Sequence, residues 1–367
     1  MGRMGRPGED AARRAAVVTV RADTAMAIVR GADRASWLQG LLTNDVAALA
    51  PGRGCYAAYL TPQGRMITDL RVLALETAVM IELPLVAKDA VLRRLESFII
   101  TEDVQLDDAS VRLARVSVYG PKAVVVAARA LADPVMVAAV PGLPAVSQTS
   151  ELTNRLWSMS EHDHHREVAD GAGQEQGVLI AATWDLGERG FDVYVPPAAV
   201  AVVHSAFEHA GAVPIDERTW EVLRVEAGRP RFGVDMDTDT IPLEAGIEDR
   251  AISFTKGCYV GQEIIVRVRD RGHGRVARRL VGLVPVAADL WPGCGIPRGA
   301  LLRVGGADIG RLTSVAYSSR RGSTVALGLV HRDFAEPGTV ATAHGEDGDV
   351  ALTVTSLPFV DLGITAA

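Results

Sequence analysis

The chain has 367 residues, of which 48% are hydrophobic and 23% charged, a balance typical of a globular protein with two or three domains. Its 38 basic and 45 acidic residues give a formal charge of −7, which argues against nucleic acid as a partner. The most apolar long stretch, 123–146, contains Arg129, Asp133 and three prolines, so we expect no membrane span.

The three cysteines are Cys55, Cys258 and Cys294, far apart and never in a C-x-x-C arrangement. This pattern argues against a disulfide framework and against a self-contained metal or iron–sulfur site. We therefore expect no bound metal and a reducing, cytoplasmic compartment. Residues 1–250 carry a formal charge of −10 and residues 251–367 carry +3, so an anion-attracting surface is expected in or near the C-terminal third.

The first part of the chain predicts an antiparallel sheet with helices packed on it. Runs of β-branched residues predict strands over 16–31, and a helical pattern follows over 32–49. Residues 54–76 are typical of two strands joined by a Pro-Gln-Gly turn at 62–64, and "AVMIELP" extends the sheet. Apolar residues at helical spacing predict a further helix over 86–99. The fold class is therefore α+β and not doubly wound.

A second unit of similar build is expected to begin near residue 111, where a strand, a Gly-Pro turn and a helix follow one another. The polar, unpatterned stretch 160–177 predicts a mobile surface loop, in which His162, His164 and His165 are interpreted as solvated rather than metal-bound. The strand "GFDVYVP" and the helices "AAVAVVHSAFEHAG" and "DERTWEVLRVEAGRP" complete the unit.

Beyond about residue 270 the pattern changes. Only short strands punctuated by glycine and proline follow, which predicts a small β-barrel over 275–362. The region before it, 15–270, is expected to hold both α+β units.

The stretch "FTKGCYVGQEIIV" places Cys258 between Gly257 and Gly261, two residues after Lys256. A neighbouring ammonium group and a helix beginning after Gly261 would both lower a thiol pKa and favour the thiolate. On pattern alone, a small residue filling a tight bend is the simpler interpretation, because none of the eight histidines is close in sequence to act as a base. A nucleophile, a ligand to a cluster shared with another protein and a structural residue all stay open.

Two further features carry alternative interpretations. If the segment after "KGCYVGQE" is a strand, Arg267, Arg269 and Arg271 share one face, which is either a solvated surface or an electropositive strip for a carboxylate-rich or phosphate-bearing ligand. In "MITDLRV", Asp69 shares a strand face with Arg71; it either pairs with that arginine or takes part in proton transfer.

Taken together, several motifs resemble one superfamily, the aminomethyltransferase (T-protein) of the glycine cleavage system, and within it the YgfZ-type folate-binding proteins. These motifs occur in the family's order over residues 30–360: "LLTNDVAAL", "TPQGRMITDLRV", "VSVYGPKA", "GERGFDVYVP", "LRVEAGRPRFGVDMDTDTIPLEAG", "KGCYVGQE" and "IGRLTSVAYS". The most specific of them, "KGCYVGQE", resembles the YgfZ-type signature. The resemblance implies a T-protein-like cloverleaf of two antiparallel-sheet α+β units plus a C-terminal β-barrel around a folate channel.

The resemblance also implies roles for individual residues. Asp69 matches the aspartate that contacts folate near the methylene-transfer nitrogens, and Asp192 matches a glutamate that holds the pteridine ring. Trp220, which replaces an arginine that helps clamp the folate, and Arg224 in the matching "LRVEAG" stretch are assigned to the same folate site. Asp185 replaces a tyrosine of the T-proteins.

The function implied by the resemblance is that of a cytoplasmic, monomeric tetrahydrofolate-binding protein that supports iron–sulfur cluster assembly or repair. Cys258 and Lys256 would form its functional centre, and the arginines from Arg267 onward would attract the glutamate tail of folate. Its partners would be iron–sulfur enzymes or assembly proteins. The alternatives are a folate-dependent aminomethyltransferase or methyltransferase that uses Asp69, and a non-catalytic scaffold that presents Cys258 to a partner.

Overall fold

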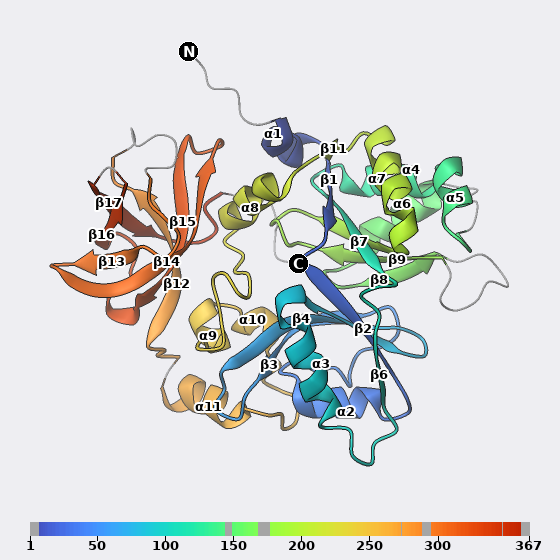
Figure 1. Cartoon of the computed structure of the whole chain (residues 1–367), viewed down its shortest axis with the longest axis horizontal. Helices are drawn as coiled ribbons and strands as arrows, with labels where there is room; N and C mark the ends of the chain where they lie inside the picture. The colour runs from blue at the N-terminus through green and yellow to red at the C-terminus, as the bar shows by residue number, and fades with distance from the viewer. Residues whose placement is uncertain are drawn as a thin grey trace.

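A computed structural model describes residues 7–143, 149–167, 177–272, 274–287, 295–346 and 348–360. It has three parts arranged like a cloverleaf: two sheets with helices, and a barrel (Figure 1). This confirms the predicted α+β class with a C-terminal β-barrel. Cys294 lies outside the described residues. No helix in the described part of the chain is long and apolar enough to cross a bilayer.

The first sheet has five antiparallel strands in the order β3-β4-β5-β2-β6. Its strands are β2 (Thr24–Arg30), β3 (Gly54–Leu60), β4 (Met66–Ala74), β5 (Val79–Pro84) and β6 (Gln105–Asp108). Its helices are α2 (Arg34–Leu41), the short η1 (Leu85–Ala87) and α3 (Lys88–Glu96). The predicted hairpin over 54–76 is confirmed.

Helix α2 is shorter than the predicted 32–49. It ends at Leu41 because the next polar side chains bind backbone groups of other segments. The hydroxyl of Thr43 donates to the carbonyl of Ala251 at 2.6 Å, and the amide of Asn44 donates to the carbonyls of Tyr56 and Arg250 at 2.8 and 3.0 Å. Such side chains compete with helix continuation.

The second sheet has six strands in the order β11-β1-β7-β10-β9-β8. Its strands are β1 (Val17–Arg21), β7 (Ala114–Tyr119), β8 (His164–Glu167), β9 (Val178–Thr183), β10 (Gly190–Val195) and β11 (Val213–Pro214). Its helices are α1 (Pro7–Arg14), α4 (Ala123–Leu131), α5 (Pro134–Ala139), α6 (Thr149–Ser158), η2 (Pro197–Ala199), α7 (Val200–His209) and α8 (Glu217–Glu226).

The strands predicted over 16–31 are confirmed, but they belong to different sheets, because β1 pairs with β7 of the second sheet while β2 lies in the first sheet. The stretch 160–177 is not a loop throughout: His164–Glu167 form β8 and pair with β9. An edge strand made of charged and histidine residues has no apolar alternation, so its sequence carried no strand signal.

The barrel is closed in the order β12-β15-β14-β13-β16-β17. Its strands are β12 (Arg278–Pro285), β13 (Leu301–Val304), β14 (Ala307–Ser318), β15 (Ser323–His331), β16 (Val340–Gly345) and β17 (Gly348–Thr355), with the short η4 (Arg332–Phe334). The linking segment contains α9 (Pro242–Ala245), α10 (Glu248–Ala251), α11 (Gln262–Val266) and η3 (Arg267–Arg271). Because η3 is a π-helical turn, the expected strand carrying Arg267, Arg269 and Arg271 on one face is wrong.

Each part has its own apolar core, and a further cluster joins the two sheets. In that cluster Met26, Leu73 and Met80 of the first sheet pack against Leu179 and Tyr194 of the second. Helix α8 packs its apolar side on the barrel. The interface between the sheets is therefore fixed by apolar packing on one side, and it turns polar toward the junction of the three parts.

Candidate functional site

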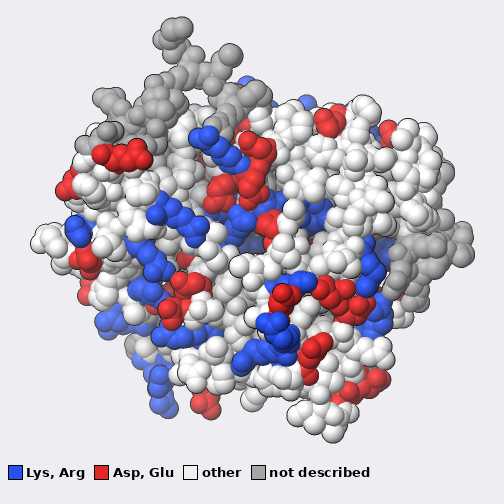
Figure 2. All heavy atoms as spheres, in the orientation of Figure 1, with Lys and Arg blue, Asp and Glu red and all other residues white. Residues whose placement is uncertain are grey.

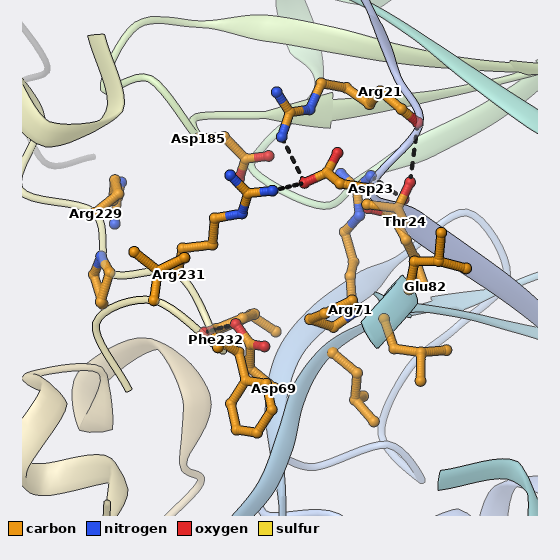
Figure 3. Close-up of a pocket in the computed structure, with 18 of the residues that line it drawn as sticks. Arg21, Asp23, Thr24, Asp69, Arg71, Glu82, Asp185, Arg229, Arg231 and Phe232 are labelled. Carbon is orange, nitrogen blue, oxygen red and sulfur yellow. Dashed lines mark hydrogen bonds and ion pairs between the residues drawn. The ribbon is translucent and has the colours of Figure 1, made fainter. Parts of the chain in front are cut away.

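A cavity of about 570 Å³ lies at this junction, between the two sheets and the segment that follows α8 (Figure 3). Strands β4, β5 and β7, the turn between β9 and β10, and residues 229–234 all contribute to its walls. Eleven charged residues line it: Arg21, Asp23, Asp69, Arg71, Glu82, Arg115, Asp185, Arg224, Arg229, Arg231 and Arg250. Figure 2 shows charged side chains of both signs gathered near the middle of the face that it displays, while the region over α4 to α7 carries few charged side chains.

A buried network of charges joins the two sheets behind this cavity. The Nη2 of Arg71 on β4 donates to Glu82 at 2.8 Å and to Asp192 at 2.6 Å. Glu82 also accepts from Arg115 and from the hydroxyl of Tyr194. Burial disfavours the charge of Glu82, but the guanidinium groups of Arg115 and Arg71 hold its pKa below the usual value. The network therefore keeps Glu82 ionised at the cavity wall.

Asp192 belongs to this network and not to the cavity wall. Its side chain is fully buried; one oxygen accepts from the Ser117 hydroxyl at 2.5 Å and the other from Arg71 at 2.6 Å. It lies on β10, the strand predicted for "GFDVYVP", opposite Ser117 of β7. From this position Asp192 holds the guanidinium of Arg71 in place at the cavity wall. A direct contact between Asp192 and a pteridine stays a prediction.

Asp69 lines the cavity from β4. Its Oδ2 accepts a hydrogen bond from the hydroxyl of Tyr56 on β3 at 2.6 Å, and its Oδ1 is buried with no hydrogen-bond partner among the described residues. Burial raises the pKa of Asp69 to about 6. The simpler interpretation, an ion pair with Arg71, is wrong because Arg71 is held by Glu82 and Asp192.

His162 lies beside this pair. Its ring stacks on Tyr56 with centroids 6.5 Å apart, and burial lowers its pKa to about 4, so the imidazole is neutral at pH 7. Its backbone is left-handed, with φ 68°, which is strained for a residue with a side chain. His162 and His164 are buried, so the expectation of solvated histidines is wrong for both.

Arg250 closes this end of the cavity. Its guanidinium lies 5.1 Å from the centroid of the Tyr56 ring, and it pairs with Glu161 at 2.9 Å. Asp69, Tyr56, His162 and Arg250 thus form one polar end of the cavity. Its acid–base group is Asp69, whose pKa of about 6 lies close to neutral pH.

Trp220 and Arg224 both line the cavity from α8. The guanidinium of Arg21 lies 3.4 Å from the centroid of the Trp220 ring, a cation–π contact. Arg224 joins α8 to the barrel region, since it donates to Asp235 at 2.7 Å and to the Ser314 hydroxyl at 2.7 Å. The structure therefore brings Asp69, Trp220 and Arg224 to one cavity.

Lys256 and Cys258 lie elsewhere and do not line the cavity. The Nζ of Lys256 donates to the backbone carbonyls of Gln39, Leu42 and Asn44 at 2.6, 2.6 and 2.9 Å. The ammonium group thus satisfies carbonyls at and beyond the end of α2. Cys258 is exposed. A shared catalytic role for Lys256 and Cys258 stays a prediction.

The expected arginine strip is also separate from the main cavity. Arg267 and Arg271 line a second hollow of about 380 Å³ together with Glu263, Ile264 and Val266. None of the three arginines of the strip lines the main cavity, so the attraction of a folate tail by them is untested. In the described ranges, no group of three or more His, Cys, Asp or Glu side chains is arranged to hold a metal ion.

Sequence reasoning missed most of the residues that line the cavity. Glu82, Arg115 and Arg229 gave no signal, because a charged residue in a strand or loop is usually solvated. Asp69 is opposite Ala58 in the predicted hairpin, two residues from Tyr56 and on the same face of the sheet, so the turn at 62–64 could have indicated the proximity of Tyr56 and Asp69. His162 lies in a stretch that carried no pattern at all.

Comparisons with known proteins agree with this architecture. Residues 9–144 match the GCVT N-terminal domain, and residues 278–361 match the glycine cleavage T-protein C-terminal barrel domain. The chain is similar to proteins named aminomethyltransferase. One from Streptomyces coelicolor is 30% identical over 85% of this chain and 77% of its own length, and one from Synechococcus elongatus is 29% identical over 90% and 81%.

A solved structure shows the same fold. The glycine cleavage system aminomethyltransferase T from Bartonella henselae superposes with a TM-score of 0.79 at 21% sequence identity. The match covers 96% of this chain and 88% of that protein. The similarity thus extends over both sheets and the barrel.

Proposed function

This chain belongs to the glycine cleavage T-protein family, and from that premise we propose that its central cavity binds tetrahydrofolate and supports folate-dependent one-carbon transfer. The observation that carries the proposal is Asp69. It is a carboxyl group with a pKa of about 6, held by Tyr56 at the wall of a cavity of about 570 Å³.

The cavity fits a reduced folate in size and in chemistry. Ligand cavities for molecules of this size usually measure about 300 to 1,000 Å³. Leu83, Pro84, Leu85, Pro230 and Phe232 give it an apolar part for an aromatic ring, beside the charged part described above. Seven arginines and four carboxylates line it, an excess of positive charge that suits a ligand with carboxylates.

The reduced folate supplies the nitrogen atoms that carry the one-carbon unit. Asp69 would hold or accept a proton near them, because its pKa lies near the working pH. Tyr56 positions the carboxyl group through the 2.6 Å hydrogen bond, and Arg71, fixed by Asp192 and Glu82, provides a stationary positive charge. Preorganised charges of this kind stabilise a transition state without further rearrangement.

The test is calorimetric titration of the protein with tetrahydrofolate, followed by an assay of methylene-tetrahydrofolate formed from an aminomethyl-lipoyl carrier. We expect saturable binding by the wild type and by Asp69→Asn, with product formed by the wild type alone. Absence of saturable heat in the wild type would remove the folate proposal. Binding without product formation in the wild type would limit the function to folate binding.

A second candidate function is support of iron–sulfur enzymes, with partners that meet Cys258. The observation favouring it is that Cys258 is exposed in the "KGCYVGQE" stretch, outside the cavity, where chemistry on the folate would not use it. The test is rescue of iron–sulfur enzyme activity in cells that lack this protein. Cys258→Ala is expected to fail, while Cys55→Ala, which removes a half-buried thiol, is expected to succeed. Rescue by Cys258→Ala would exclude a role for the thiol.

A further inference from the structure

The charged residues of the cavity differ in how they are paired. Nine of the eleven are held by a hydrogen bond or a close ion pair to another side chain. Arg21 and Arg231, for example, both bind Asp23, at 2.7 and 2.9 Å, as Figure 3 shows. The other two are Asp185 and Arg229. Charges at a ligand cavity that the protein leaves without partners are available to a ligand.

Asp185 lies in the turn between β9 and β10 with its side chain 34% exposed. Neither of its carboxylate oxygens accepts a hydrogen bond from a described side chain, and the nearest guanidinium nitrogen, Nη2 of Arg115, is 3.9 Å away. Although burial disfavours its charge, Arg115, Arg71 and Arg250 lower the pKa of Asp185 to about 2. It is therefore an ionised hydrogen-bond acceptor that faces the cavity.

Arg229 is the complementary case. Within the described parts of the chain its guanidinium makes no hydrogen bond or close ion pair, and it lies near the like charge of Arg250. Burial, followed by the charge of Arg250, lowers the pKa of Arg229. Its backbone is fixed nonetheless: its N–H donates to the carbonyl of Arg224, and its carbonyl accepts from the Arg224 guanidinium. The residue is held at the cavity although its guanidinium has no hydrogen-bond acceptor among the described residues, with the carboxylates of Glu161 and Asp185 acting on it only at longer range.

We propose that Asp185 and Arg229 together bind one edge of the ligand's heterocycle, and that the edge is that of a 2-amino-4-oxopyrimidine ring. Asp185 accepts the hydrogen bonds of the 2-amino group and the adjacent ring N–H, and Arg229 donates to the oxygen at C4. This inference rests on the proposed function, because the reduced pterin of tetrahydrofolate carries that edge.

The chemistry of the two residues matches this edge and differs from that of Asp192. A carboxylate accepts two parallel hydrogen bonds from N–H groups, and a guanidinium donates to an oxygen. The pair therefore recognises a ligand edge that carries two neighbouring donors followed by an acceptor. Asp192 cannot do so without breaking its bonds to Ser117 and Arg71. The specificity for the heterocycle is therefore placed at Asp185, with Asp192 acting through Arg71.

The test uses three probes under anaerobic conditions: tetrahydrofolate, tetrahydrobiopterin, which has the same ring without the tail, and tetrahydroaminopterin, in which an amino group replaces the C4 oxygen. Dissociation constants are measured for the wild type, Asp185→Asn and Arg229→Met. The matched controls are Asp308→Asn and Arg303→Met, which break an exposed ion pair on the barrel.

We expect the wild type to bind the 4-oxo ring of tetrahydrofolate at least roughly 10- to 100-fold more tightly than the 4-amino ring, because the 4-amino ring has neither the C4 oxygen that accepts from Arg229 nor the ring N–H that donates to Asp185. Arg229→Met should reduce that preference, and Asp185→Asn should weaken tetrahydrofolate and tetrahydrobiopterin by a similar factor but tetrahydroaminopterin by less. The ratio between probes within one variant does not depend on the fraction of the variant that is folded.

Each outcome decides between the two proposals. If tetrahydrofolate binds the wild type, Asp185→Asn and Arg229→Met equally well, the inference is overturned and folate binding stands. If tetrahydrobiopterin binds the wild type and is bound more weakly by Asp185→Asn and by Arg229→Met, while tetrahydrofolate does not bind, the inference stands and the folate proposal falls. If no reduced pterin binds, both are overturned.

Discussion

At the scale of single residues, burial raises the pKa of Asp69 and lowers that of His162. The two shifts make the stability of the fold change with pH in opposite directions. Between about pH 4 and 6 the folded chain keeps a proton on Asp69 that the unfolded chain has lost, so Asp69 makes stability fall as the pH rises. His162 has a pKa of about 4, so between about pH 4 and 6.5 the unfolded chain binds the extra proton and stability rises with pH.

In the variant Asp69→Asn, His162 should therefore contribute to the pH dependence of stability without the opposing effect of Asp69. We expect its free energy of unfolding to rise more steeply with pH than that of the wild type between pH 4 and 6. At pH 7 it should be more stable than the wild type by roughly 1 to 3 kcal/mol. Urea denaturation at several pH values measures both quantities. An identical pH dependence in the two proteins would contradict the raised pKa of Asp69.

Arg229 predicts a conflict between stability and binding. Because burial and Arg250 disfavour its charge, Arg229→Met should raise the midpoint of thermal unfolding in the absence of ligand by roughly 1 to 3 °C. Arg229→Lys, which keeps a positive charge, is the control, and its midpoint of thermal unfolding should not rise. A lower midpoint for Arg229→Met would show that its guanidinium stabilises the fold.

At the scale of elements, Lys256 connects the "KGCYVGQE" stretch to the end of helix α2. Its ammonium group binds three carbonyls and the residue is only 8% exposed. Lys256→Met leaves these carbonyls without a donor, and we expect a loss of roughly 2 to 4 kcal/mol in the free energy of unfolding. Cys258→Ala, at an exposed position, should stay within about 0.5 kcal/mol of the wild type.

The comparison of Lys256 and Cys258 also bears on function. If Lys256→Met keeps full stability but loses the rescue of iron–sulfur enzymes, the lysine acts with the thiol, as the sequence motif predicts. Loss of stability with retention of rescue in the remaining folded protein would make Lys256 structural. Urea denaturation and the cellular assay on the same variants separate the two.

At the scale of the whole molecule, the barrel holds one wall of the cavity in place through Asp235. This fully buried carboxylate binds Arg224 at 2.7 Å and the hydroxyls of Thr313 and Ser314 at 2.6 and 2.7 Å. Segment 229–234, which follows Arg224, lines the cavity. The barrel thus affects the cavity although its strands contribute no lining residue.

Asp235→Asn removes one of the two charged partners of the buried Arg224, the other being Glu221, and we expect a loss of roughly 3 kcal/mol in the free energy of unfolding. The dissociation constant for tetrahydrofolate should also rise, because segment 229–234 loses its support. Limited proteolysis and calorimetry measure the two effects, with Asp308→Asn as the control at an exposed barrel pair. Unchanged stability would mean that the barrel does not fix this wall.

Local patterns of apolar residues, glycine and proline were enough to predict the fold class, the hairpin over 54–76, the helices after the second unit's strands and the C-terminal β-barrel, since each depends on residues close together in the sequence. The motif resemblance assigned Asp69, Asp192, Trp220 and Arg224 to one folate site; Asp69, Trp220 and Arg224 line the cavity, and Asp192 lies behind it. Three features became visible only in the folded chain: β1 crosses to the second sheet, Asp192 lies behind Arg71, and the side chains of Asp185 and Arg229 line the cavity without a hydrogen bond to a described side chain. The reason is physical: pairing and burial of a charge depend on residues 100 or more positions away, such as Arg71 and Asp192, and local patterns carry no information about them.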